Sequence, residues 1–76
     1  MSKLIETPEL YQQITERVQN CREVHAVYAP GSNSCHPELY LAAVDLNQSG
    51  QTYRVYFTVD SNGAIQVQHL ERWYFG

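Results

Sequence analysis

The segment covering residues 52–59 constrains the fold of this chain more than any other, because its apolar and polar side chains alternate without a break. The apolar side chains of one parity are Tyr53, Val55, Phe57 and Val59. Successive side chains of an extended strand point to opposite faces, so this set shares one face of a sheet. That face must therefore lie against a core.

A helix is predicted before the strands, over residues 8–20. Thr7 can cap it with its hydroxyl, Pro8 suits the first helical position, and Asn20 tolerates the left-handed conformation that ends many helices. Four apolar residues recur at spacings that place them on one side of this helix: Leu10, Ile14, Val18 and Cys21. We expect this stripe to face the core.

Three other short, apolar and partly β-branched stretches accompany residues 51–60, and turn residues separate them. They cover residues 23–29, 38–47 and 64–71. The pattern predicts a single α+β domain over residues 1–76, in which an N-terminal amphipathic helix packs on an antiparallel β-meander of about four strands.

Side-chain parity also predicts register, because directly opposed residues of antiparallel strands point to the same side. A loop of residues 61–63, with Gly63 in the left-handed region, keeps the apolar face continuous. The predicted pairs are Val59–Ile65, Phe57–Val67, Leu46–Tyr53, Val44–Val55 and Ala42–Phe57. His69 and Glu71 then hold the inward parity, so either the last strand ends there or a bulge intervenes.

Composition limits the class of protein. A chain of 76 residues buries only ~60% of the surface that it exposes when unfolded, so a dimer interface would add useful stability. The five Lys and Arg residues are scattered and are outnumbered by eight acidic residues. Nucleic-acid binding needs clustered positive charge, so we expect none.

The sequence also bounds the compartment. Residues 1–6 lack the apolar core of a secretory signal, and no window approaches the ~20 apolar residues that span a bilayer. Cys21 and Cys35 are too few for a disulfide-stapled secreted scaffold. We expect a cytoplasmic protein with reduced thiols and no membrane association.

The sharpest candidate for chemistry is Cys35–His36, in a loop of small polar residues. A thiol beside an imidazole can act as a nucleophile or redox sensor, but adjacent residues seldom face each other and the local signatures of thiol enzymes are absent. The residues that could ligate a metal match no zinc spacing: Cys21, Cys35, His25, His36 and His69. We therefore expect no metal and no cofactor.

The face of the sheet opposite the helix is unusually apolar and is edged by Arg54. Its composition resembles that of a docking surface, where Tyr and Arg are enriched and Lys is depleted. The predicted surface residues are Leu39, Leu41, Arg54, Tyr56, Trp73, Tyr74 and Phe75. Alternatively, the aromatic C-terminal residues fold back and cover this face.

Two functions remain. We expect a non-catalytic interaction module or small subunit that docks on another protein or on its own copy through this face, an exposed strand edge or the C-terminal aromatics. The alternative is a small thiol-dependent enzyme or redox sensor at Cys35 and His36.

Overall fold

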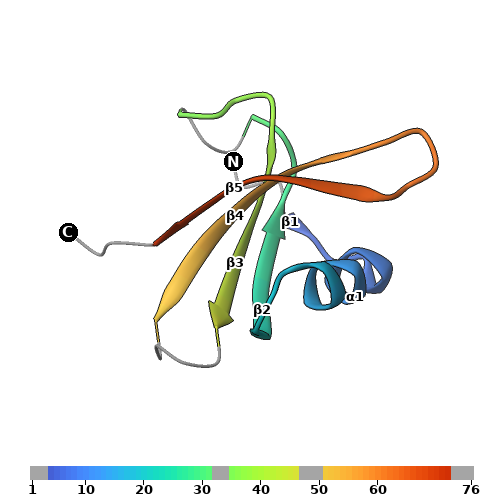
Figure 1. Ribbon diagram of the computed structural model, residues 1–76. Helices are drawn as coiled ribbons and strands as arrows, with labels where there is room; N and C mark the ends of the chain where they lie inside the picture. Colours follow the sequence, from blue (N-terminus) through green and yellow to red (C-terminus); the bar gives the residue numbers. More distant parts are fainter. Residues whose placement is uncertain (1–3, 32–34, 47–50, 73–76) are drawn as a thin grey trace.

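A computed structural model describes residues 4–31, 35–46 and 51–72, which form one helix and five strands (Figure 1). In chain order the elements are β1 (Leu4–Ile5), α1 (Pro8–Arg17), β2 (Cys21–Tyr28), β3 (Tyr40–Leu46), β4 (Thr52–Val59) and β5 (Ile65–Arg72). The strands lie in the same order in one antiparallel sheet. The predicted α+β fold, a helix packed on an antiparallel meander, is confirmed, with five strands in place of about four.

The additional strand is β1, which pairs with the end of β2 through Leu4 opposite Tyr28 and Ile5 opposite Val27. Its two residues are too few for an alternating pattern, so the sequence carries no strand signal there. The four predicted strands agree with β2 to β5 within two residues at each end.

The helix α1 begins at Pro8 as predicted, but it ends at Arg17, three residues earlier than expected. Asn20 has a φ of 64°, so this asparagine turns the chain into β2 in the predicted left-handed conformation. Thr7 occupies the N-cap position without making a side-chain capping hydrogen bond, which corrects that detail of the prediction. Cys21 is the first residue of β2 and still packs against the core.

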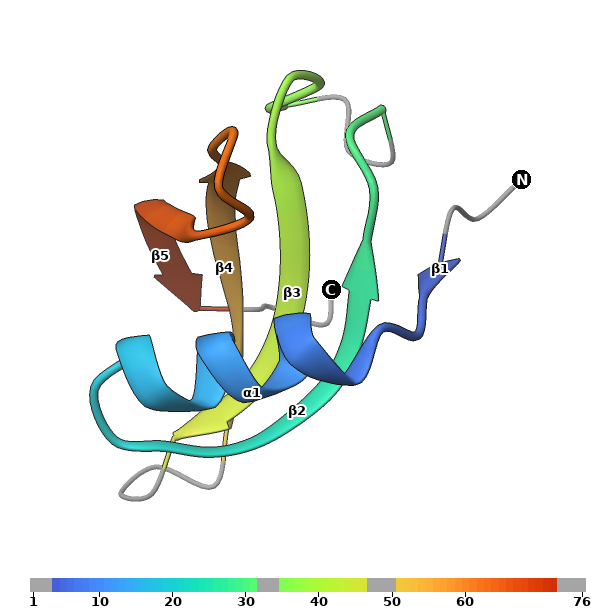
Figure 2. The same ribbon diagram turned by 90° about the vertical axis from the view of Figure 1, so that its right-hand side faces the viewer.

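The helix covers one face of the sheet, which we call the inner face (Figure 2). The buried cluster between the two layers consists of Ile14, Val18, Val27, Ala42, Val44, Val55, Phe57 and Ile65. The predicted alternation of faces in β4 is confirmed, because Val55 and Phe57 face the helix. Tyr56, between them in sequence, faces the other side, which we call the outer face.

The register of β3 and β4 differs from the prediction by two residues. Val44 lies opposite Tyr53 and Ala42 opposite Val55, whereas the predicted partners were Val55 and Phe57. A shift of two keeps every side chain on its face, so parity alone cannot exclude it. The connection, residues 47–50, lies outside the described residues.

The hairpin of β4 and β5 has the predicted register, with Val59 opposite Ile65 and Phe57 opposite Val67. Gly63 has the expected positive φ, 83°. The Asp60 carboxylate accepts the backbone N–H groups of Asn62 and Ala64, which stabilises this turn. One residue farther along, the register shifts at a bulge, so the second of the two alternatives for this strand is confirmed.

Candidate functional site

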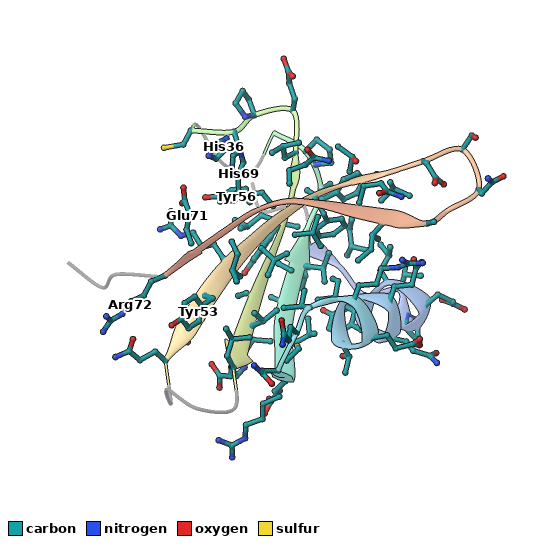
Figure 3. All side chains as sticks on the ribbon, viewed as in Figure 1. His36, Tyr53, Tyr56, His69, Glu71 and Arg72 are labelled. Atoms are coloured by element: carbon teal, nitrogen blue, oxygen red, sulfur yellow. The ribbon has the colours of Figure 1, made fainter. Side chains whose placement is uncertain are left out.

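A cluster of rings lies on the outer face, where His36 from the segment before β3 meets the sheet (Figure 3). The centroid of the His36 ring is 4.4 Å from that of Tyr56 on β4 and 5.0 Å from that of His69 on β5. Tyr56 is fully buried although it points away from the helix. His36 therefore helps to cover the centre of the outer face.

The bulge in β5 places His69 in this cluster. Between the pairs Phe57–Val67 and Tyr56–His69, β5 contains one extra residue, Gln68. The extra residue reverses the parity of the strand, so His69 and Glu71 reach the outer face instead of the inner one. Glu71 Oε1 then lies 3.9 Å from His36 Nε2, and Arg54 is the cross-strand neighbour of Glu71.

These contacts bear on the predicted thiol site. Cys35 is exposed, and the imidazole of its neighbour His36 packs on Tyr56 and lies beside Glu71. The contacts with Tyr56 and Glu71 orient the His36 imidazole. Thiol chemistry at Cys35 and His36 stays a prediction.

The predicted docking surface is only partly accessible. Leu41 and Tyr56 have exposed fractions of 6% and 0%, so both are interior residues, and a partner could not reach them without displacing the chain that covers them. Leu39 and Arg54 are half-buried. The C-terminal part of that surface, Trp73, Tyr74 and Phe75, lies outside the described residues, as does the alternative in which it covers the sheet.

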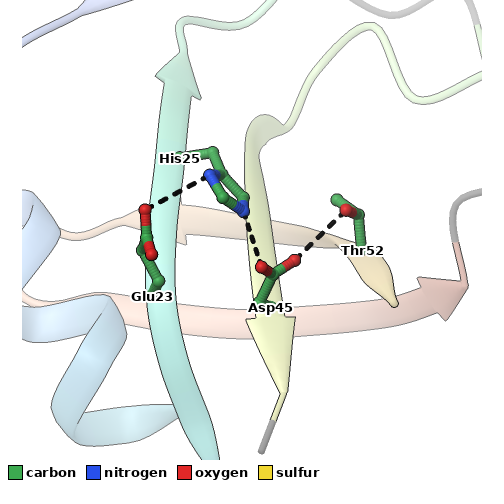
Figure 4. Close-up of polar contacts among 4 residues, drawn as sticks. All are labelled: Glu23, His25, Asp45 and Thr52. Carbon is green, nitrogen blue, oxygen red and sulfur yellow. Dashed lines mark hydrogen bonds and ion pairs between the residues drawn. The ribbon is translucent and has the colours of Figure 1, made fainter. Parts of the chain in front are cut away.

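A second polar cluster joins β2, β3 and β4 (Figure 4). His25 Nε2 donates a hydrogen bond to Asp45 Oδ2 at 2.9 Å, and its Nδ1 lies 3.5 Å from Glu23 Oε2. The Thr52 hydroxyl donates to the other Asp45 oxygen at 3.2 Å. The hydrogen bond from His25 holds the pKa of Asp45 below its ordinary value.

The contacts of this cluster are structural. An aspartate that orients a histidine is half of a nucleophile-activating arrangement, in which the second ring nitrogen faces a hydroxyl or thiol. Here the second nitrogen of His25 faces the carboxylate of Glu23. The imidazole therefore links two acidic residues across neighbouring strands.

The residues weighed as metal ligands do not come together as one set, although His36 and His69 are neighbours. Cys21 is the first residue of β2, where burial raises the pKa of its thiol. His25 contacts Glu23 and Asp45. Within residues 4–31, 35–46 and 51–72, no three His, Cys, Asp or Glu side chains are grouped so that they could hold a metal ion.

Strand β5 is exposed along most of its length. Every residue of this strand after Ile65 is exposed, and two large apolar side chains on it, Val67 and Leu70, have exposed fractions of 43% and 48%. Among the described strands β5 pairs with β4 alone, so one edge carries backbone groups without a strand beside them.

The helix closes the first part of this edge through Gln13. Its side-chain Nε2 donates to the carbonyl of Gly63 at 2.8 Å, and its Oε1 accepts the N–H of Ile65 at 3.1 Å. A residue of a neighbouring parallel strand would make the same two bonds, one on each side of Ala64. Gln13 therefore occupies the edge at residues 63–65 and leaves the rest of β5 uncovered by the helix.

The one helix that the structure describes, α1, lacks the length and apolar character needed to cross a membrane. No protein-family model, no curated protein and no solved structure matches this chain.

Proposed function

We propose that this chain is a non-catalytic protein-interaction module that docks through the edge of β5. The observation that carries the proposal is the exposure of this strand, which places Val67 and Leu70 beside a row of backbone donors and acceptors. Strand addition to a sheet edge uses such groups for affinity and alternate side chains for specificity.

The direction of the backbone groups supports this mode of docking. The N–H of Ile65 points away from β4, since it donates to Gln13. Strand groups repeat every second residue, so the N–H and C=O of Val67 point the same way. A partner strand laid beside β5 would find these groups next to the exposed side chains.

The polar clusters favour binding over catalysis. The His25 imidazole is held between two carboxylates and the His36 imidazole is packed on Tyr56, so each has a structural use. We also propose that the module is cytoplasmic, because two cysteines are too few for a disulfide-stapled secreted scaffold.

Peptide selection tests the proposal. A random peptide library is displayed, clones that bind the immobilised protein are isolated, and their binding sites are mapped by amide chemical shifts. We expect selected peptides to shift the amides of residues 66–72 and to lose binding to a Val67→Lys/Leu70→Lys variant. The matched control is Leu4→Lys, because Leu4 on the opposite edge strand is 49% exposed.

Peptide binding to the β5 variant and to the Leu4→Lys control distinguishes edge docking from docking elsewhere. Peptides that bind the control variant as tightly as the wild type but fail on the β5 variant support edge docking. Peptides whose shifts centre on the outer face, or that bind the β5 variant unchanged, would show that the interaction surface lies elsewhere.

A further inference from the structure

We infer that the occupant of the β5 edge is a second copy of this chain, paired antiparallel about a two-fold axis that passes through Leu70. This inference rests on the proposed function, because it names the partner of the same edge. Its basis is the sequence and geometry of the accessible part of β5.

The accessible part is short and regular. Gln13 fills the edge at residues 63–65, and the bulge at Gln68 interrupts the ladder three residues after Ile65. From His69 to Arg72 the strand pairs with β4 without irregularity. A partner strand can therefore pair with regularly spaced backbone groups in the second half of β5.

Charge and apolar contacts select the register of a self-pair. With Leu70 opposite the partner's Leu70, each Glu71 lies opposite the partner's His69, and the exposed leucines cover each other. Shifting the centre by one residue places either Glu71 opposite the partner's Glu71 or His69 opposite the partner's His69. Like groups opposite each other are unfavourable, so the Leu70 register is preferred.

The neighbours of Glu71 in its own chain fit this arrangement. Arg54 is its cross-strand partner on β4, and His36 Nε2 lies 3.9 Å from its carboxylate. Pairing would place the partner's His69 on the open side of the same carboxylate. Glu71 would then have basic or imidazole groups on each side, so its carboxylate would face groups of complementary chemistry.

The two edges of the sheet differ in a way that limits assembly to a dimer. The opposite edge strand, β1, has two residues, whereas β5 has eight. A chain with one long edge can pair that edge only with the same edge of another copy, which gives a closed two-fold dimer and not a filament. The result is one continuous sheet with both helices on the same face.

Sedimentation equilibrium and site-specific crosslinking test this inference. In a Cys35→Ser background, we compare a Leu70→Cys variant with a Gln66→Cys variant under mild oxidation. The Cα atoms of directly opposed residues lie about 4.5–5.5 Å apart, which a disulfide can bridge. Leu70→Cys should therefore form covalent dimers rapidly and Gln66→Cys slowly. Leu70→Glu should raise the dimer dissociation constant at least ~tenfold, and Gln66→Glu should leave it unchanged.

A chain that sediments as a monomer at millimolar concentration, with equal crosslinking of the two cysteine variants, overturns the self-pairing. Retained binding of selected peptides at residues 66–72 in that case would leave the proposed function intact. If neither dimerisation nor peptide binding at residues 66–72 is observed, the edge of β5 is not an interaction site.

Discussion

Gly63 is a position where the backbone restricts the choice of side chain. It has a φ of 83°, and no atom outside residues 62–64 lies within 4 Å of the place where a Cβ would be. Gly63→Ala should therefore lower the free energy of unfolding by about 1 kcal/mol through backbone strain alone. Gly63→Asn should lower it by less, because asparagine tolerates this conformation. Urea denaturation measures both, and equal losses would contradict the argument.

Asp45 should give the fold a specific dependence on acid. Because His25 lowers the pKa of this carboxyl in the folded state, its stabilisation is fully present above the ordinary pKa of aspartate, about 3.9. It is lost as the pH falls through the lowered pKa of the folded state. We expect the free energy of unfolding to fall in this range and the fall to be smaller in Asp45→Asn.

Urea denaturation between pH 5 and the acid limit of folding measures this effect. The charged and titratable groups near Asp45 are His25, Glu23, Arg22 and Cys21. Glu23→Gln serves as the control, because it keeps the His25–Asp45 hydrogen bond. An acid slope in Asp45→Asn as steep as that of the wild type would show that another carboxyl is responsible.

At the scale of the elements, Gln13 joins α1 to the turn before β5. Gln13→Ala removes two hydrogen bonds to the backbone, and each such bond contributes about 0.5–1.5 kcal/mol, so we expect a loss of roughly 1–3 kcal/mol. Gln12→Ala is the matched control, because Gln12 is exposed on the same helix. The amide of Ile65 should also exchange with solvent faster in Gln13→Ala alone. Equal exchange in both variants would remove this role.

The same elements show what a sequence can and cannot predict. The register of β4 and β5 was predictable because Gly63 identifies the turn, and the turn sets the pairing. The register of β3 and β4 was not, since parity allows any shift by two. The end of α1 was placed three residues too late because apolar spacing continues through Val18 and Cys21 into the next strand.

The candidate site was harder to predict for a physical reason. His36 meets Tyr56 and His69 because a loop folds over the sheet and a bulge reverses the parity of β5, and neither event has a local sequence pattern. The Gln13 bonds join residues about 50 positions apart. The exposure of Val67 and Leu70 follows from the position of β5 at the edge, which only the complete sheet defines.

At the scale of the whole molecule, the small core couples folding to association. Net stability scales at ~0.05–0.15 kcal/mol per residue, so 76 residues give only about 4–11 kcal/mol. Anything that binds the folded state alone adds to this narrow margin and makes the melting temperature depend on concentration. If β5 pairs with its own copy, dilution should therefore lower the melting temperature of the wild-type chain.

Protein concentration sets the size of that shift. For a fully associated dimer, each tenfold rise in concentration adds about 0.7 kcal/mol per chain, which corresponds to roughly 3–6 °C for a domain of this size. Calorimetry from micromolar to millimolar protein measures it. Leu70→Glu should melt at one temperature throughout, and Leu4→Glu, on the short opposite edge, should keep the wild-type slope. A wild-type chain without any slope would mean that folding proceeds independently of a second copy, and the edge of β5 would then be open to another protein.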